Sequence, residues 1–168
     1  IMKLLLRLYK PNSGTIMIDG HDITTISPEY IRSNVTFINQ NSRLFDTKVI
    51  DNMMYGCKQE DDCKRNLKNV MEYEKIKELY KRINIYDDSA GTMGENLSGG
   101  QRQIVNVISG LINPSPILVL DEPTNALDPG LKRELLNVIQ DFRKFKKSII
   151  IITHDKEVQS LFDTTVQM

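Results

Sequence analysis

The chain has 168 residues, of which 26% are charged and 40% hydrophobic, as in an ordinary globular domain with one core. Its 22 basic and 22 acidic residues cancel, so composition provides no net positive charge to attract nucleic acid or an anionic membrane. The longest apolar runs, such as residues 117–120, fall far short of the roughly 18 residues that a membrane-spanning helix needs.

The first predicted elements are a helix and two short strands. Apolar residues at helical spacing predict a buried helix over residues 1–9, which Pro11 ends. Residues 15–18 alternate in polarity and lead into an Asp-Gly turn, which is the pattern of a short strand. Residues 35–38 predict a second strand, which ends shortly before Gln40.

Both ends of the chain are expected to be cut from a longer polypeptide. The helical spacing is already running at Ile1 with no helix cap before it, and the far end stops inside a β-like segment at residues 164–167. Any membrane-spanning part would then lie elsewhere on that polypeptide or on another chain.

The middle of the chain, residues 41–94, predicts a small helical subdomain. Charged residues crowd between positions 58 and 82, and apolar residues recur there at helical intervals. Cys57 and Cys63 flank the start of this stretch. A secreted domain of this size would use more cysteines, and only two histidines are available as further metal ligands. We therefore expect both cysteines to be reduced thiols in a cytosolic compartment.

The second half of the chain predicts alternating helices and strands. A long helix follows Gly100, an apolar strand covers residues 117–120, a helix covers residues 131–145, and another apolar strand covers residues 148–153. Strands that are apolar throughout are buried on both faces, so this order predicts a parallel sheet with helices on either side. A basic cluster near the end of the second helix is expected to complement the dipole of its last turn. The cluster comprises Arg143, Lys144, Lys146 and Lys147.

Four polar residues follow predicted strands, at the carboxyl ends where open α/β sheets place their chemistry. They are Gln40, Asp121, Glu122 and His154. The acidic pair resembles the Walker B motif, in which a strand directs one carboxylate at a magnesium-bound water and the next at an attacking water. An ordinary acidic turn would give the same pattern, so the convergence of these strand ends carries more weight than any one motif.

The string Leu-Ser-Gly-Gly-Gln at residues 97–101 is the most specific pattern in the chain. Ser98 is a favourable helix N-cap, and the two glycines would let a phosphate approach the backbone closely. Free N–H groups at a helix start carry about half a positive charge and form an anion site. A plain capped helix after a glycine turn is the alternative, and the complete string favours phosphate binding over it.

These motifs together resemble those of ABC-type ATPase domains. Residues 97–101 resemble the family's signature motif, and its other motifs appear in the family's order: a Q-loop at Gln40, Walker B at residues 117–122, a D-loop at residues 125–128 and a switch histidine at His154. The connecting stretches at residues 4–23 and 44–56 resemble exporter-type members.

The resemblance implies an α/β fold of the P-loop NTPase class, with a RecA-like parallel sheet flanked by helices. An α-helical subdomain that carries the signature motif would be inserted into this core. We place the core at residues 1–40 and 110–168 and the helical subdomain at residues 41–109.

The resemblance also implies a role for each motif residue, with ATP and Mg²⁺ as ligands. Glu122 would be the general base that activates water, Asp121 would hold Mg²⁺ through water, and Gln40 would approach the metal and the attacking water. His154 would contact the γ-phosphate. The remaining contacts would be made to the ATP of the opposite subunit or along the seam between subunits, by Ser98, Gly99, Gly100, Gln101 and Asp128.

The chain departs from the family pattern in several places. The family has a Gly-x-x-Gly-x-Gly-Lys-Ser/Thr loop just before the helix that opens here at Ile1, and the 168 residues contain no such string. We therefore expect the chain to bind ATP weakly or not at all by itself. Thr92 stands where exporters have a glutamate that meets the membrane domain, and Ile104 and Ser109 replace common basic residues. These changes are expected to affect coupling rather than the fold.

The resulting hypothesis is the ATP-hydrolysing motor domain of an exporter-like ABC transporter at the cytoplasmic face of a membrane. Its expected partners are a second ABC ATPase domain, in a homo- or heterodimer, and a transmembrane domain, with no nucleic acid. Two other interpretations stay open: a soluble ABC ATPase that acts on nucleic acid or ribosomes, and a non-catalytic partner that presents only its signature motif to another subunit's ATP. The stretch from Gln40 to Leu97 is too short for the coiled coil of chromosome-organising members.

Overall fold

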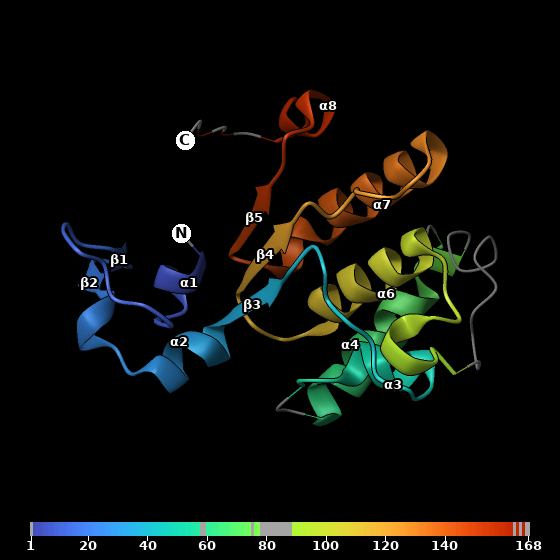
Figure 1. The fold of residues 1–168 in the computed structure, drawn as a ribbon, viewed down its shortest axis with the longest axis horizontal. Coiled ribbons are helices and arrows are strands. Elements are labelled where there is room, and N and C mark those ends of the chain that lie inside the picture. The colour runs from blue at the N-terminus through green and yellow to red at the C-terminus, as the bar shows by residue number, and fades with distance from the viewer. Residues whose placement is uncertain are drawn as a thin grey trace.

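The computed structural model describes residues 2–57, 60–74, 76–77, 89–162, 164 and 166, which form a layered α/β fold (Figure 1). Its helices are α1 (Met2–Leu5), α2 (Pro28–Asn34), α3 (Val49–Met54), α4 (Glu60–Glu72), α6 (Gly99–Ile112), α7 (Pro129–Phe142) and α8 (Lys156–Gln159). Its strands are β1 (Met17–Ile18), β2 (His21–Asp22), β3 (Val35–Ile38), β4 (Ile117–Asp121) and β5 (Ser148–Ile152). Short 3-10 turns lie at Ile23–Thr25, Thr92–Gly94 and Arg143–Phe145. Across these ranges, every helix is too short or too polar to traverse a bilayer.

The centre of the fold is a parallel sheet with the strand order β3-β4-β5. Alternate residues of β4 face opposite sides: Leu118 and Leu120 join the larger apolar core, whereas Val119 joins a smaller one. All three side chains are fully buried. The predicted parallel sheet is therefore confirmed, and β4 has packed layers on both faces. The expectation that β5 is also buried on both faces is wrong, because none of its residues is buried.

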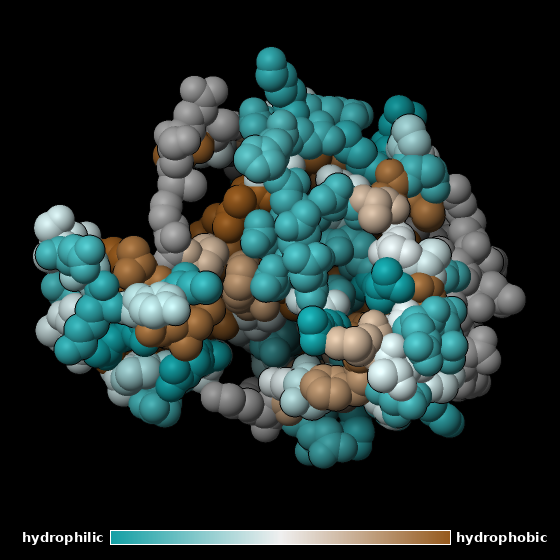
Figure 2. Space-filling model, viewed as in Figure 1, coloured by the Kyte–Doolittle hydropathy of each residue, from teal (hydrophilic) through white to brown (hydrophobic). Residues whose placement is uncertain are grey.

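Each face of the sheet has its own cover. Helices α6 and α7 lie on one side, and the N-terminal segment with α1 and the β1–β2 hairpin lies on the other (Figure 1). Ile23 and Ile31 of the N-terminal segment pack with Val119 in the smaller core. Apolar side chains gather on the visible surface where this segment meets the sheet, whereas the surface over α8 is hydrophilic (Figure 2). The outer face of β5 stays partly open, and Ile150 is 41% exposed there.

Helix α6 joins the sheet to the helical part of the chain. It contacts α3 and α4 on one side and β3, β4 and α7 on the other. Gly110 makes the approach to the sheet possible, because a Cβ added there would lie 2.8 Å from a methyl group of Leu118 and 3.0 Å from Ile38. The boundary that we predict between residues 109 and 110 falls inside this helix, and the division into two subdomains stays a prediction.

The predicted elements are confirmed with shifted ends. The helix predicted over residues 1–9 ends at Leu5, and the chain turns at Arg7, which has a left-handed backbone with φ 54°. The expectation that this helix is buried is wrong, because no residue of α1 is buried. The helix predicted over residues 131–145 begins earlier, because Asp128 caps it and Pro129 occupies its first position. The predictions that fall on Ile1, on residues 78–88 and on Thr165 and Gln167 lie outside the described residues.

The expectation of two reduced thiols is wrong. Cys57 and Cys63 are paired as a disulfide, with their Cα atoms 6.4 Å apart, within the usual range. Cys57 follows a turn in which Gly56 has φ 80°, and Cys63 is fully buried near the start of α4. The number of cysteines and the lack of other ligands do not reveal this turn, which brings the two sulfur atoms together.

The basic cluster after α7 does more than complement that helix. Arg143 and Lys144 lie in the 3-10 turn that follows α7, as the dipole argument expects. Lys146 instead reaches across to the chain segment after α6, where its ammonium donates to the carbonyls of Asn113 and Ser115, the latter at 3.0 Å. Burial lowers the pKa of Lys146 from its ordinary value of 10.5 to about 8.

This pKa gives a testable dependence of stability on pH. Between pH 8 and 10.5 the unfolded chain keeps a proton on Lys146 that the folded chain has lost, so the free energy of unfolding rises with pH across this window. We expect a rise of about 1–2 kcal/mol, reduced from the full value because the side chain is only partly buried. Urea unfolding at pH 8 and pH 10.5 measures it. Lys146→Met should abolish the rise and Lys147→Met should keep it, and equal rises in the wild type and Lys146→Met would contradict the assignment.

Candidate nucleotide and catalytic site

The carboxyl ends of the three parallel strands meet at one cleft. Gln40 follows β3, Glu122 follows β4 and His154 follows β5, and all three side chains line an open cleft of about 430 Å³. Thr124 and Asn125 complete much of its wall. The structure thus brings these three predicted residues together. Asp121 is the last residue of β4, half-buried beside them.

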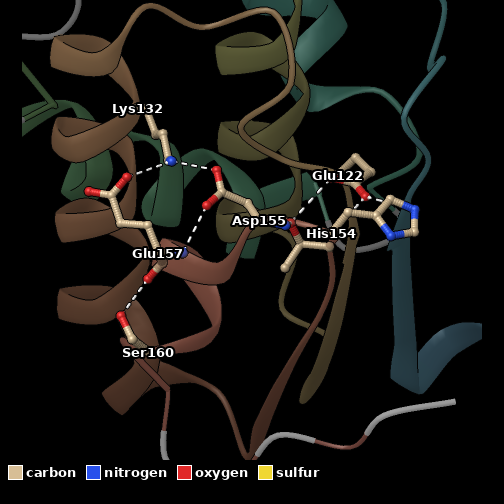
Figure 3. Close-up of polar contacts among 7 residues, drawn as sticks. Glu122, Lys132, His154, Asp155, Glu157 and Ser160 are labelled. Atoms are coloured by element: carbon tan, nitrogen blue, oxygen red, sulfur yellow. Dashed lines mark hydrogen bonds and ion pairs between the residues drawn. The ribbon is translucent and has the colours of Figure 1, made fainter.

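Glu122 is held in a defined orientation by the segment after β5. Its backbone is left-handed, with φ 48°, and its N–H donates to the carbonyl of Ile152 at 2.8 Å. Its carboxylate accepts from the Thr153 hydroxyl at 3.2 Å and from the His154 N–H at 3.0 Å (Figure 3). A left-handed backbone is unfavourable for a residue with a side chain, so this turn uses local strain to present the carboxylate at the strand end.

The ring of His154 is the most accessible group of the cleft. Its side chain is 100% exposed, compared with 16% for Glu122, and its Nε2 lies 3.7 Å from Glu122 Oε1. Only the backbone of His154 is fixed, through the hydrogen bond to Glu122. The ring can therefore contact a ligand that enters the cleft from solvent.

The signature string begins α6 as predicted. The Ser98 hydroxyl accepts from the Gln101 N–H at 3.2 Å, and the Ser98 N–H donates to the Gln101 side chain at 2.7 Å, which is a complete capping box. Ser98 is exposed, so the helix start faces solvent. The remaining free N–H groups of this first turn can receive an anion.

The packing of α6 also requires a glycine at position 100, which we did not predict from the sequence. A Cβ at this position would lie 3.1 Å from Leu127 and 3.2 Å from the carbonyl oxygen of Ala126. A Cβ at Gly99 would make only an ordinary contact, 3.4 Å from Ala126. Gly100 is therefore needed for α6 to pack against residues 125–128, whatever its part in phosphate binding.

Residues 125–128 form a tight turn between β4 and α7. Ala126 has φ 65°, and Asp128 caps α7 by accepting from the N–H groups of Gly130 at 2.9 Å and Leu131 at 3.1 Å. A second cleft, of about 910 Å³, lies beside the signature turn and shares Gln40 and Asn125 with the first. The signature turn and the strand-end cleft thus lie next to each other.

Two buried polar residues of α6, which we did not single out, connect it to this region. Gln103 is 5% exposed, and its amide donates to the backbone carbonyl of Glu122 at 3.4 Å. Asn106 is 7% exposed and donates to the carbonyl of Ser42, just after Gln40, at 3.1 Å. The available signal was polar residues on the apolar face of a predicted helix, because buried polar groups need partners.

Comparison with known proteins places the chain in a family. The family model described as ABC transporter matches residues 1–125. The chain is 32% identical over 154 residues to an ATP-dependent lipid A-core flippase of Francisella tularensis, covering 90% of this chain and 25% of the flippase. It is 34% identical over 163 residues to methionine import ATP-binding protein MetN 2 of Bacillus anthracis, covering 94% of this chain and 46% of that protein.

A solved structure shows the same fold. A bacterial Atm1-family ABC exporter with ATP bound superposes with a TM-score of 0.76 at 29% identity, covering 90% of this chain and 26% of the exporter. The chain thus spans between a quarter and a half of the length of these three proteins. The match over most of its length and the shared architecture show that this chain belongs to the ABC transporter family and has the P-loop NTPase fold of its ATP-binding domains.

Proposed function

We propose that this chain is the part of an exporter-type ABC transporter that hydrolyses ATP, working as one of two paired ATPase domains at the cytoplasmic face of a membrane. The observation that carries the proposal is the cleft in which Gln40, Glu122 and His154 meet at the carboxyl edge of the sheet. A flippase among the relatives and an exporter among the structures support the transport role.

Glu122 is the residue that would activate water. Its carboxylate is held by two donors at the strand end and still borders the cleft, so one oxygen can take a proton from a water placed between it and the γ-phosphate. The exposed His154 ring would contact that phosphate. Phosphoryl transfer depends mostly on positioning and charge neutralisation, which this arrangement can supply.

Oxygen donors suited to Mg²⁺ lie at the same edge. Asp121 ends β4 and Gln40 follows β3, and a carboxylate with an amide oxygen matches the preference of Mg²⁺ for oxygen ligands. Within the described residues there is no cluster of three acidic, histidine or cysteine side chains that would hold a metal unaided. A magnesium ion held by Asp121 and Gln40 would take its other ligands from phosphates and water and would neutralise phosphate charge.

The signature turn is proposed to act on the nucleotide of the opposite domain. Ser98 and Gln101 build a helix start that faces solvent, and Gly99 and Gly100 leave it without bulky side chains. Asp128 lies in the turn against which this helix start packs, so it would line the seam of the pair. Closing the two domains would therefore complete each site.

A groove beside α3 is proposed to receive the transmembrane domain. Phe45 and Tyr55 are 50% and 65% exposed, with ring centroids 4.2 Å apart, and both line a groove of about 420 Å³ with Arg32. Asn52 fixes the backbone of Phe45 through two hydrogen bonds, at 2.7 and 3.0 Å. An exposed but rigid aromatic pair is typical of a surface that binds a partner.

The direct test is phosphate release by the full-length transporter that contains these 168 residues, in lipid vesicles with ATP and Mg²⁺. We expect turnover that stops when EDTA removes the metal. The control is the 168-residue chain by itself, which has no Gly-rich Lys-Ser/Thr string and should show neither hydrolysis nor tight ATP binding by calorimetry. If the assembly folds but does not hydrolyse ATP, the proposed function is wrong. Tight ATP binding by the 168-residue chain alone would contradict the expectation that a chain without the Gly-rich Lys-Ser/Thr loop binds ATP weakly.

A further inference from the structure

An ion cluster joins α7 to the segment after β5. Lys132, one turn into α7, donates to the carboxylates of Asp155 and Glu157, the latter at 2.7 Å (Figure 3). The Lys132 side chain is only 16% exposed, whereas those of Asp155 and Glu157 are 34% and 58% exposed. The hydrogen bond to Asp155 raises the pKa of Lys132, and the same bond lowers the pKa of Asp155, so both groups are charged at neutral pH.

Asp155 connects this ion cluster to the cleft. One oxygen of its carboxylate accepts from the Lys132 ammonium. The other oxygen caps α8 by accepting from the Glu157 N–H at 2.9 Å, so both oxygens of the side chain are held. The N–H of Asp155 donates to the Thr153 hydroxyl oxygen at 3.0 Å. That hydroxyl therefore points its own hydrogen at Glu122 Oε2, 3.2 Å away.

The other end of the chain of contacts is the turn at residues 125–128. The backbone N–H of Lys132 donates to the carbonyl of Asp128 at 2.9 Å, so the lysine belongs to the first turn after that cap. Hydrogen bonds and ion pairs thus run without a break from the capped start of α7, through Lys132, Asp155 and Thr153, to the Glu122 carboxylate.

We propose that Lys132 and Thr153 are positioning residues for ATP hydrolysis, which tie the start of α7 to the segment after β5 and thereby set the orientation of the Glu122 carboxylate. This inference rests on the proposed role of Glu122. Neither residue touches the reacting atoms. Their loss should lower kcat and leave KM for ATP unchanged, because nucleotide binding does not depend on where the carboxylate points.

A surface ion pair with no other role would behave differently. Exposed pairs are screened by water and contribute little, so removing one charge would alter neither turnover nor the neighbouring backbone. Lys132 is instead largely buried, and it fixes the carboxylate of Asp155. The two residues before Asp155 donate to Glu122, and the N–H of Asp155 holds the Thr153 hydroxyl that is one of these donors. A misplaced catalytic group lowers turnover steeply even when the shift is small.

The experiment compares Lys132→Met with Arg133→Met in the assembled transporter. Arg133 is the next residue of α7 and is exposed, so both variants remove one positive charge from the same helix. We expect kcat to fall about ten- to a hundredfold in Lys132→Met, with KM for ATP within about twofold of wild type and Arg133→Met unchanged. Lys132→Arg should recover most of the turnover.

Thr153 gives an independent arm. Thr153→Val keeps the branched shape but loses the hydroxyl, and it should lower kcat in the same way, whereas Thr153→Ser should restore it. Hydrogen exchange followed by mass spectrometry, without ATP, should show faster exchange of the amides of His154 and Asp155 in Lys132→Met and Thr153→Val only.

The outcomes separate this inference from the proposed function. If wild type hydrolyses ATP and Glu122→Gln does not, but Lys132→Met turns over at the wild-type rate with unchanged amide exchange, the positioning role is overturned. If wild type itself releases no phosphate, the proposed function fails, and the positioning role in hydrolysis fails with it whatever the amides show.

Discussion

Glu122→Gln in the assembled transporter is expected to reduce ATP turnover by about 10²–10⁴-fold while ATP-driven closure of the two ATPase domains persists. Glutamine keeps the shape of the side chain, and its amide oxygen can still accept from the Thr153 hydroxyl or the His154 N–H. It lacks a carboxylate that can take a proton from water. Phosphate release and cross-linking of the two domains with ATP measure the two effects separately.

Glu29→Gln is the matched control for this substitution. Glu29 lies in α2, its side chain is 76% exposed, and it is paired with Arg32 rather than with the cleft. The same chemical change there should leave turnover within about twofold of wild type, since substitutions on an exposed surface have small effects. Undiminished phosphate release from Glu122→Gln would remove Glu122 as the base.

Gly100→Val should abolish closure and lower turnover by about a hundredfold or more, because a small displacement of a positioned group costs that much. A branched side chain cannot fit where even a Cβ lies 3.1 Å from Leu127 and 3.2 Å from the Ala126 carbonyl. The start of α6 must then move away from residues 125–128, and the solvent-facing N–H groups move with it. ATP-driven cross-linking and phosphate release report the loss.

Gly99→Ala is the control for added bulk in the same turn. Its Cβ would make an ordinary contact, 3.4 Å from Ala126, so we expect the packing of α6 on residues 125–128 and the free energy of unfolding to stay close to wild type. Any loss of closure in this variant then reports the phosphate contact of Gly99 and not a displaced helix. Circular dichroism and urea unfolding should show that Gly100→Val still folds, which separates a displaced helix start from a lost fold. Normal closure in Gly100→Val would show that the packing of α6 on this turn is dispensable.

Local patterns predicted the parts of the site that are local. Ser98 was predicted as a helix cap and is one, because the residues that bond to it lie within three positions. The apolar strands and their carboxyl ends followed from residue type alone, so the meeting of Gln40, Glu122 and His154 could be predicted once a parallel sheet was assumed. The roles of these residues stay predictions.

The rest depended on contacts between segments that are distant in the chain. Lysine and aspartate are common on protein surfaces, so nothing in the sequence singles out Lys132 and Asp155. Only the packing of α7 beside β5 makes them neighbours. The pairing of Cys57 with Cys63 depended on a turn that composition does not reveal. The reason for Gly100 also came from three-dimensional packing, because a glycine in a phosphate-binding pattern has two possible explanations and its sequence neighbours cannot distinguish them.

The strand order has a consequence for how the chain folds as it is made. β3 pairs with β4 although α3, α4 and α6 all come between them in the sequence. At a synthesis rate of about 5–20 residues per second, the nascent chain would carry β3 with an open edge for several seconds before β4 is made. Pairing between such distant strands is slow, and open edges invite association with other chains. The first half of this chain is therefore the part that should most need a chaperone.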